Sequence, residues 1–270
     1  MIGQKNLLKQ IPDSLDRLPH TILIEGIKGS GRHSLVNEIG NKFGIQPINL
    51  ENEGLTFLDN LILSGVVSFC YFDITNMSIK EQNEILKFLE EPSNNCYYFL
   101  LCENSSQVLP TVLNRCQRLE MEPYTREQLK TFYDEYIMFN EFQYTNDRVL
   151  EIAKTPGDII SLLDSNVDEV TSLVENIINN IGNANFSNVL VLVDKIKEFN
   201  ETKGVVDFET FLKVFFYTIR EKIKVDSNVK LYDVYFKLQD IYRFHKMSYL
   251  HLNEKQLYEK FLLDLKLVLR

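Results

Sequence analysis

The first 120 residues alternate short apolar runs with segments of helical periodicity. The apolar runs predict four strands, at residues 21–25, 66–73, 96–102 and 116–121. The segments between them predict helices at 32–43 and 79–91 and a short helix near Val108; Ser78 caps the second helix and Pro92 ends it. Strands that alternate with helices in this way predict a parallel sheet covered on both faces.

The strand signal disappears after Pro123, and the rest of the chain is helical in period. Thr125 opens a helix over 125–136, with Gln128 at capping-box spacing. Further helices are predicted at residues 146–153, 158–163, 167–179, 186–199, 208–223, 231–245 and 254–269, with a break at 155–157. We therefore expect an α/β domain at 1–123, a small helical domain at 124–166 and an all-α domain at 167–270.

Composition and charge limit the classes of protein. The chain has 270 residues without an uninterrupted apolar run of 18, so we expect no membrane span. The first residues lack an apolar stretch, so we expect no secretory signal. The net charge of −9 argues against a DNA-binding protein that acts alone. Residues 201–270 carry 13 basic against 10 acidic residues, so this part of the chain is positively charged. Either random scatter of charges or contact with an acidic partner or nucleic acid would explain the difference.

The four cysteines do not predict a metal site. Cys70, Cys96, Cys102 and Cys116 include no C-x-x-C pair, and the four histidines show no metal-ligand spacing. Cys70 and Cys102 lie inside apolar runs, as buried cysteines do. We therefore expect free thiols, no zinc and a reducing, cytoplasmic location.

Residues 26–33, GIKGSGRH, follow a predicted strand, precede a predicted helix and match the G-x-x-x-x-G spacing of a P-loop. The glycines Gly26, Gly29 and Gly31 would let backbone N–H groups point at phosphate oxygens beside a positive helix end. A working loop continues with Lys and then Ser or Thr, but here Arg32 and His33 follow. Arg is a wider, planar cation, and Mg²⁺ prefers oxygen ligands to imidazole. The loop therefore predicts either weak nucleotide binding or an inherited shape without nucleotide, and we favour the second.

Asp73 stands at the end of the strand predicted at 66–73. A carboxylate at this end of a strand beside a P-loop is where P-loop ATPases hold Mg²⁺. Ile74 follows it, and an alkyl side chain cannot polarise water. Asp73 could equally serve as a cap at the end of the strand.

Four blocks of sequence carry a family resemblance: MIGQ at 1–4, LPH at 18–20, EQNEILKFLEEP at 81–92 and LPTVLNRCQR at 109–118. The third is similar to E-A-Q-N-A-L-L-K-T-L-E-E-P and the fourth to L-P-T-I-x-S-R-C-Q-x, motifs of the AAA+ subunits of DNA clamp loaders. Their order and spacing match as well. The resemblance covers residues 1–130 well and 131–170 loosely, while the remainder is similar only in being helical.

Among clamp-loader subunits the chain most resembles the delta-prime type of bacterial DNA polymerase III, which keeps an arginine finger without an ATP site of its own. Arg115 matches the finger, although Asn114 replaces the Ser that precedes it in the family. Ile74 stands where active subunits have a water-positioning Glu, and Gly157 where their lid has an Arg. One departure is that the four-cysteine zinc insertion of many homologues is absent between the P-loop and residue 66.

The resemblance implies a non-hydrolysing subunit of a replicative polymerase holoenzyme, with residues 124–166 as a lid and 167–270 as an oligomerisation collar. Arg115 would act in trans on ATP bound by a neighbouring ATPase subunit, and the chain would need no cofactor. Lys87 would couple DNA contact to the ATP site, although a lysine on a helix face is usually just solvated. The implied partners are the ATPase and delta-type subunits, the sliding clamp and primer-template DNA. We also expect exposed aromatic side chains at 208, 211 and 215–217 to form part of the collar interface.

Two other hypotheses stay open. The chain could be an ATP-hydrolysing subunit of the gamma/tau type that tolerates Arg32 and His33 in its P-loop. It could also be a helical adaptor that keeps only the AAA+ shape. ATP turnover by the isolated chain separates the first from a delta-prime role, and co-purification with a clamp-loader ATPase separates the second.

Overall fold

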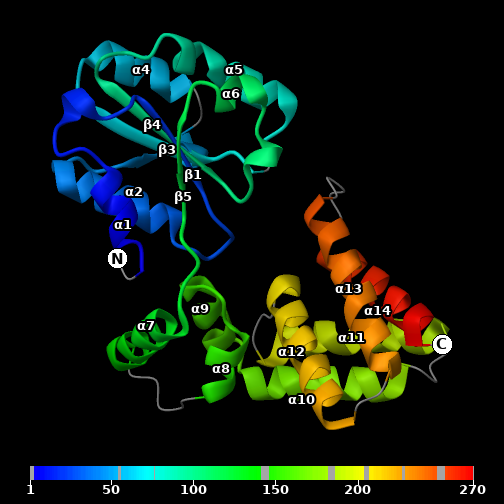
Figure 1. Cartoon of the computed structure of the whole chain (residues 1–270). Helices are drawn as coiled ribbons and strands as arrows, with labels where there is room; N and C mark the ends of the chain where they lie inside the picture. Colours follow the sequence, from blue (N-terminus) through cyan, green and yellow to red (C-terminus); the bar gives the residue numbers. More distant parts are fainter. Residues whose placement is uncertain are drawn as a thin grey trace. The chain divides into compact units, whose positions relative to one another are not determined.

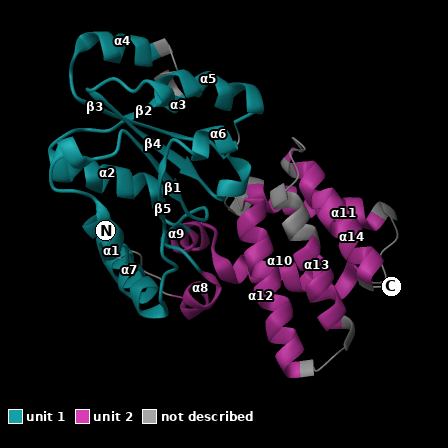
Figure 2. Ribbon diagram, turned by 45° about the horizontal axis from the view of Figure 1, so that its top comes forward, with its two compact units in different colours: residues 1–140, 154–157 teal, residues 141–153, 158–270 magenta. Residues whose placement is uncertain are grey.

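The computed structural model describes residues 3–53, 56–75, 77–140, 146–181, 186–203, 207–226, 229–247 and 253–269. The chain divides into two compact units, one of residues 1–140 and 154–157 and the other of residues 141–153 and 158–270 (Figure 2). The division into three domains at residues 123 and 166 stays a prediction.

The first unit is built on a five-stranded parallel sheet with the strand order β2-β3-β4-β1-β5 (Figure 1). Its strands are β1 (Thr21–Glu25), β2 (Ile48–Asn49), β3 (Ser68–Asp73), β4 (Cys96–Cys102) and β5 (Gln117–Glu120). Every residue of the central strand β4 is buried. All strands run parallel, so the ends of β1, β3 and β4 meet at one edge of the sheet.

Helices cover both faces of this sheet, as the alternating pattern predicts (Figure 1). Along β1, Leu23 belongs to one apolar core, whereas Ile22 and Ile24 belong to the other. The helical elements of the unit are α1 (Lys5–Gln10), η1 (Leu15–Arg17), α2 (Arg32–Phe43), α3 (Leu50–Glu53), α4 (Thr56–Ser64), α5 (Ile79–Glu90), η2 (Ser105–Gln107), α6 (Pro110–Leu113) and α7 (Arg126–Phe139). The first core packs against α4, α5 and α6, and the second against α1 and α2.

Two helix starts are confirmed down to their hydrogen bonds. Ser78 and Glu81 form a capping box at the start of α5, and Thr125 and Gln128 form one at the start of α7. Each box satisfies backbone N–H groups that the first turn of a helix leaves without partners. Their local spacing explains why the sequence identifies both starts.

Other boundaries differ from the prediction. The strand expected from residue 66 begins at Ser68. The two-residue strand β2 and the helices α1, α3 and α4 lie where no element is predicted. Helix α9 begins at Pro156, where we expected a break. Proline is tolerated in the first turn because its missing N–H would have no helical partner there.

The second unit contains α8 (Asp147–Ile152), most of α9 (Pro156–Asp164), α10 (Val167–Ile181), α11 (Phe186–Lys203), α12 (Phe208–Asp226), α13 (Val229–Met247) and α14 (Glu254–Leu269). The expected exposure of the aromatic residues on α12 is wrong for Phe208, Phe211 and Phe215, which are buried. They pack edge-to-face against Phe261 of α14, with ring centroids 5.0 to 6.0 Å apart. The sequence of α12 alone does not show that α14 covers this face.

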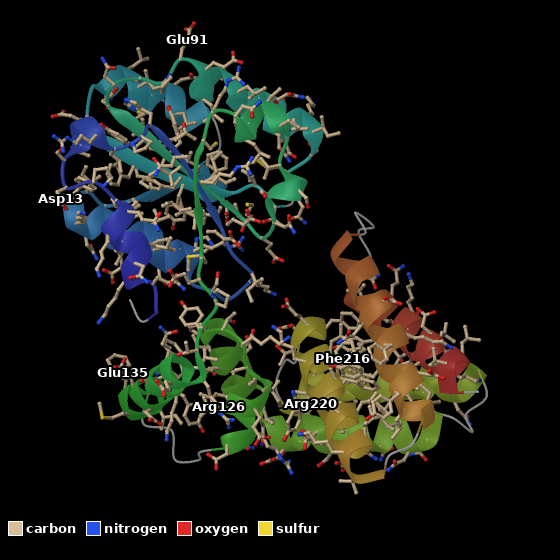
Figure 3. The ribbon with its side chains drawn as sticks, viewed as in Figure 1. Asp13, Glu91, Arg126, Glu135, Phe216 and Arg220 are labelled. Atoms are coloured by element: carbon tan, nitrogen blue, oxygen red, sulfur yellow. The ribbon has the colours of Figure 1, made fainter. Side chains whose placement is uncertain are left out.

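The two remaining aromatic residues of α12 are half-buried. Phe216 (Figure 3) packs edge-on against Tyr235 of α13, and Tyr217 donates a hydrogen bond to Glu151 of α8.

In the part of the chain that the structure describes, no helix is long and apolar enough to span a bilayer.

Candidate functional site

The turn between β1 and α2 has the backbone shape of a P-loop. Gly29 and Gly31 have φ angles of 79° and 89°, in the left-handed region that glycine adopts without strain. Gly31 caps α2, and the N–H of Gly26 donates to the carbonyl of Cys102 on β4. The loop therefore presents the N-terminus of a 12-residue helix at the carboxyl edge of the sheet.

The Arg32 side chain turns inward from this loop and pairs with Asp73. Arg32 is only 7% exposed, and its Nη2 lies 3.1 Å from Asp73 Oδ2 at the end of β3. The other carboxylate oxygen, Oδ1, accepts a hydrogen bond of 2.8 Å from the N–H of Thr75. Both oxygens of Asp73 are thus engaged within the chain. Among the described residues, Arg32 Nη1 and Ser30 Oγ are buried without a hydrogen-bond partner.

His33 follows Arg32 and Ile74 follows Asp73, and neither residue completes a nucleotide site. The exposed His33 ring packs edge-on against Tyr71, with centroids 5.5 Å apart. Ile74 is fully buried in the apolar core that contains α5. Ile74 therefore cannot orient water, and the oxygen ligands that Mg²⁺ prefers are either replaced or already engaged. The residues present are a poor fit for Mg²⁺-ATP.

Gly157 lies directly against the loop. Its N–H donates to the Gly29 carbonyl at 3.0 Å. A Cβ on Gly157 would lie 2.5 Å from Gly29 Cα, so no larger residue fits without a backbone shift. Tyr124 adds a 2.7 Å hydrogen bond from its hydroxyl to the Ser30 carbonyl. Backbone packing thus occupies the position at which the resemblance expects a lid arginine.

Arg115 follows α6 and precedes β5, in the loop position expected for it. Its Nη2 lies 2.7 Å from Glu90 Oε1, and its Nη1 donates to the Thr111 carbonyl at 2.7 Å. The side chain is 35% exposed. The guanidinium is therefore held at the surface, with its orientation set by a carboxylate and a carbonyl.

Helix α5 is bound to the segment before Arg115 through Gln82, which is buried. Gln82 Nε2 donates to the carbonyls of Met77 and Gln107, and its Oε1 accepts from the N–H of Leu109. This amide links α5 to the start of α6. Gln82 and Glu90 both lie in the 81–92 block, but the sequence alone predicts a role for neither.

Lys87 lies on α5, with its side chain 63% exposed. Its Nζ is 3.8 Å from Asp59 Oδ2 and 4.4 Å from the centre of the Phe88 ring.

The predicted site residues thus form two separate groups in the first unit. The loop glycines, Arg32 and Asp73 form one, and α5 with Arg115 forms the other.

The four cysteines are free; three are buried, and Cys116 is half-buried. Burial raises the pKa of Cys70, Cys102 and Cys116 to about 12 and also raises that of Cys96. Across the described part of the chain, no three His, Cys, Asp or Glu residues are grouped as metal ligands.

We expect the folded protein to react with Ellman's reagent at pH 8 far more slowly than the same protein in guanidinium. The thiolate is the reactive form, and these thiols stay protonated and covered in the folded state. The raised pKa values also mean that the buried thiols contribute to the stability of the fold. That contribution is complete below the pKa of an unfolded thiol and is lost as pH rises toward 12. Fast reaction of two or more thiols in the folded chain would contradict this burial.

Comparisons with known proteins agree with this fold. A family model described as "DNA polymerase III, delta subunit" matches residues 70–125, the stretch that holds Asp73, Lys87 and Arg115. DNA polymerase III subunit delta' of Bacillus subtilis is 22% identical over 212 residues, which cover 64% of this chain and 60% of that protein. The match thus spans less than two thirds of the relative's length.

One solved structure shares the fold. A DNA polymerase III gamma subunit-related protein of Thermotoga maritima superposes with a TM-score of 0.50 at 14% identity, covering 99% of this chain and 100% of that one. A RuvB variant of the same organism gives a TM-score of 0.49 at 16% identity, over 82% and 76% of the two chains. The chain resembles the AAA+ clamp-loader subunits of bacterial DNA polymerase III, and the delta-prime subunit among them.

Proposed function

We propose that this chain is a delta-prime-like clamp-loader subunit that does not hydrolyse ATP. It supplies Arg115 in trans to a neighbouring ATPase subunit while a sliding clamp is loaded on primed DNA. The observation that carries the first part is the Arg32–Asp73 pair, which engages the carboxylate that a P-loop ATPase would give to Mg²⁺.

The pair is costly to open. Arg32 is buried, and Asp73 is 24% exposed. Removing one partner from a buried ion pair typically costs about 3–5 kcal/mol, because it leaves the other charge uncompensated. A Mg²⁺ ion would have to displace Arg32 from Asp73 and would find His33 in place of a hydroxyl ligand.

The second part of the proposal is supported by the place and chemistry of Arg115. It lies in a loop and its side chain is partly exposed, so it can reach a neighbouring subunit. A guanidinium near a transferring γ-phosphoryl group stabilises charge in the transition state and is worth about 10³–10⁵ in rate. A subunit with this task needs no ATP site of its own.

The remaining assignments are proposals from the same resemblance. ATPase and delta-type subunits, the clamp and primer-template DNA would be the partners, with Lys87 coupling DNA contact to the ATP site. Lys87 is exposed enough to meet a phosphate once it leaves Asp59. Residues 124–166 would act as a lid and 167–270 as a collar. We further propose a cytoplasmic protein without zinc or another cofactor.

An ATP-hydrolysing, gamma/tau-like subunit is the second candidate. Two observations favour it: the loop keeps the P-loop backbone shape, and Arg32 Nη1 is without a partner among the described residues. In that case Arg32 would have to leave Asp73 and contact phosphate.

The isolated chain should therefore show no Mg²⁺-dependent ATP turnover above background. The measurement is phosphate release by the full chain with and without Mg²⁺. The double variant Arg32→Ala/Asp73→Asn is the matched control, because it removes the loop cation without leaving the Asp73 charge uncompensated. Activity that persists in this folded variant comes from a contaminating ATPase, whereas turnover of about 1 s⁻¹ or more that is lost in it would favour the second candidate.

A further inference from the structure

We propose that Glu90 is a positioning residue for Arg115. It would fix the guanidinium in advance, in the orientation in which it meets the phosphate of a neighbouring subunit. This inference rests on the proposed function of Arg115. Glu90 is the last residue of α5, and Arg115 lies two residues beyond α6.

Two anchors hold the guanidinium, one at each Nη atom. Glu90 Oε1 lies 2.7 Å from Nη2, and the Thr111 carbonyl accepts from Nη1 at 2.7 Å. Arg carries five N–H donors, so two anchors leave others for a ligand. A bond between a guanidinium and a carboxylate is charge-assisted and stronger than a neutral hydrogen bond.

Prior fixation changes the rate because a free arginine side chain populates many rotamers. Immobilising a rotamer-rich side chain on binding costs affinity, and a contact made beforehand removes that cost. Catalytic donors act best when they are oriented before charge develops. Glu90 thus acts through Arg115 and need not touch the nucleotide.

The anchor itself stands on a rigid element. Phe88 and Leu89 bury the last turn of α5 in the core, at 5% exposure each. Gln82 joins the first part of the same helix to the backbone at Gln107 and Leu109, just before α6. The backbones of Glu90 and Arg115 are therefore held at a defined separation, so the ion pair defines one orientation of the side chain.

The neighbour Glu91 provides a matched control. It is the next residue in the chain, is exposed, and points away from the unit (Figure 3). Glu90→Gln and Glu91→Gln remove the same charge one residue apart, but only the first acts on the contact with Arg115. Both positions are exposed, so both variants should fold.

The test is the ATPase rate of the loader reconstituted with each variant, in the presence of clamp and primed DNA. Glu90→Gln should lower kcat about two- to tenfold, with KM for ATP unchanged. Glu91→Gln should match the wild type. Glu90→Gln should add nothing in an Arg115→Ala background. In the isolated chain, ¹⁵N relaxation of the Arg115 Nε–H should change from ordered in the wild type to mobile in Glu90→Gln.

Three results would overturn the inference. An unchanged rate would mean that Glu90 is not needed, and a raised rate would mean that it masks the finger. An equal loss in the Arg115→Ala background would make the effect structural. If Arg115→Ala itself keeps the wild-type rate, the proposed function fails as well, so the two failures are distinguishable.

Discussion

Replacing Arg115 by alanine is expected to lower ATP hydrolysis about 10³-fold or more at the neighbouring ATP site that we propose this chain completes. The variant should fold and assemble, because Arg115 is a partly exposed loop residue and its removal opens no core cavity. Its ion pair with the half-exposed Glu90 contributes little to stability, as surface pairs do. The lower hydrolysis rate would therefore come from the missing guanidinium charge near the γ-phosphoryl group of the neighbouring subunit.

The measurement is single-turnover hydrolysis by the reconstituted loader with clamp and primed DNA, because other sites in the complex dilute a steady-state effect. Arg118→Ala is the control, since it removes an exposed arginine three residues further on, in β5. Arg115→Lys should restore part of the rate, because a lysine keeps the charge but not the planar fork. A complex that assembles with Arg115→Ala and hydrolyses ATP at the wild-type rate would show that Arg115 is not a finger.

The sequence identifies the features that depend on local spacing. The buried strand β4, the P-loop turn and the two capping boxes each follow from residues within one short segment. The same holds for the losses at Arg32, His33 and Ile74, which are visible because the motif fixes where to look. These predictions needed no knowledge of how distant segments pack.

Contacts between distant segments could not be predicted in this way. Arg32 and Asp73 stand on different elements, and nothing in either motif states that the two side chains pair. The sequence shows a glycine at position 157, where the resemblance expects an arginine. Only the structure shows why a larger residue does not fit there, which is the close contact of Gly157 with Gly29. The burial of the aromatic residues of α12 likewise depends on α14, far along the chain.

The P-loop and the region of α5 and α6 differ in how their charged and polar groups are used. At the P-loop, internal contacts of Arg32 and Gly157 take the places of ligand contacts. At α5 and α6, hydrogen bonds hold a cation at the surface, partly exposed. These two features match the proposed function, in which the chain would have no ATP chemistry of its own and would offer a cation to a neighbour's site.

A large effect on stability is also expected in the second unit, at Lys213 of α12. Its Nζ is 2.7 Å from Asp158 Oδ1 and 2.9 Å from Glu209 Oε1. The Asp158 side chain is only 5% exposed. Burial lowers the pKa of Lys213, but the two carboxylates outweigh burial and the pKa is raised overall. This contribution to stability is therefore complete below the pKa of an unfolded lysine and is lost as pH rises through the folded value.

Lys213→Met is expected to lower the free energy of unfolding at pH 7 by about 3–5 kcal/mol, because it removes the cation that lies 2.7 Å from the buried Asp158 carboxylate. The measurement is urea unfolding of the full chain, followed by far-UV circular dichroism. Lys224→Met is the control, since it breaks an exposed pair with Glu221 on the same helix and should change stability by no more than about 0.5 kcal/mol. Adding Asp158→Asn to Lys213→Met should recover part of the lost stability, because it removes the buried negative charge that Lys213 pairs with in the wild type. If Lys213→Met unfolds at the same urea concentration as the wild type, or if Asp158→Asn destabilises it further, charge compensation is not what Lys213 provides.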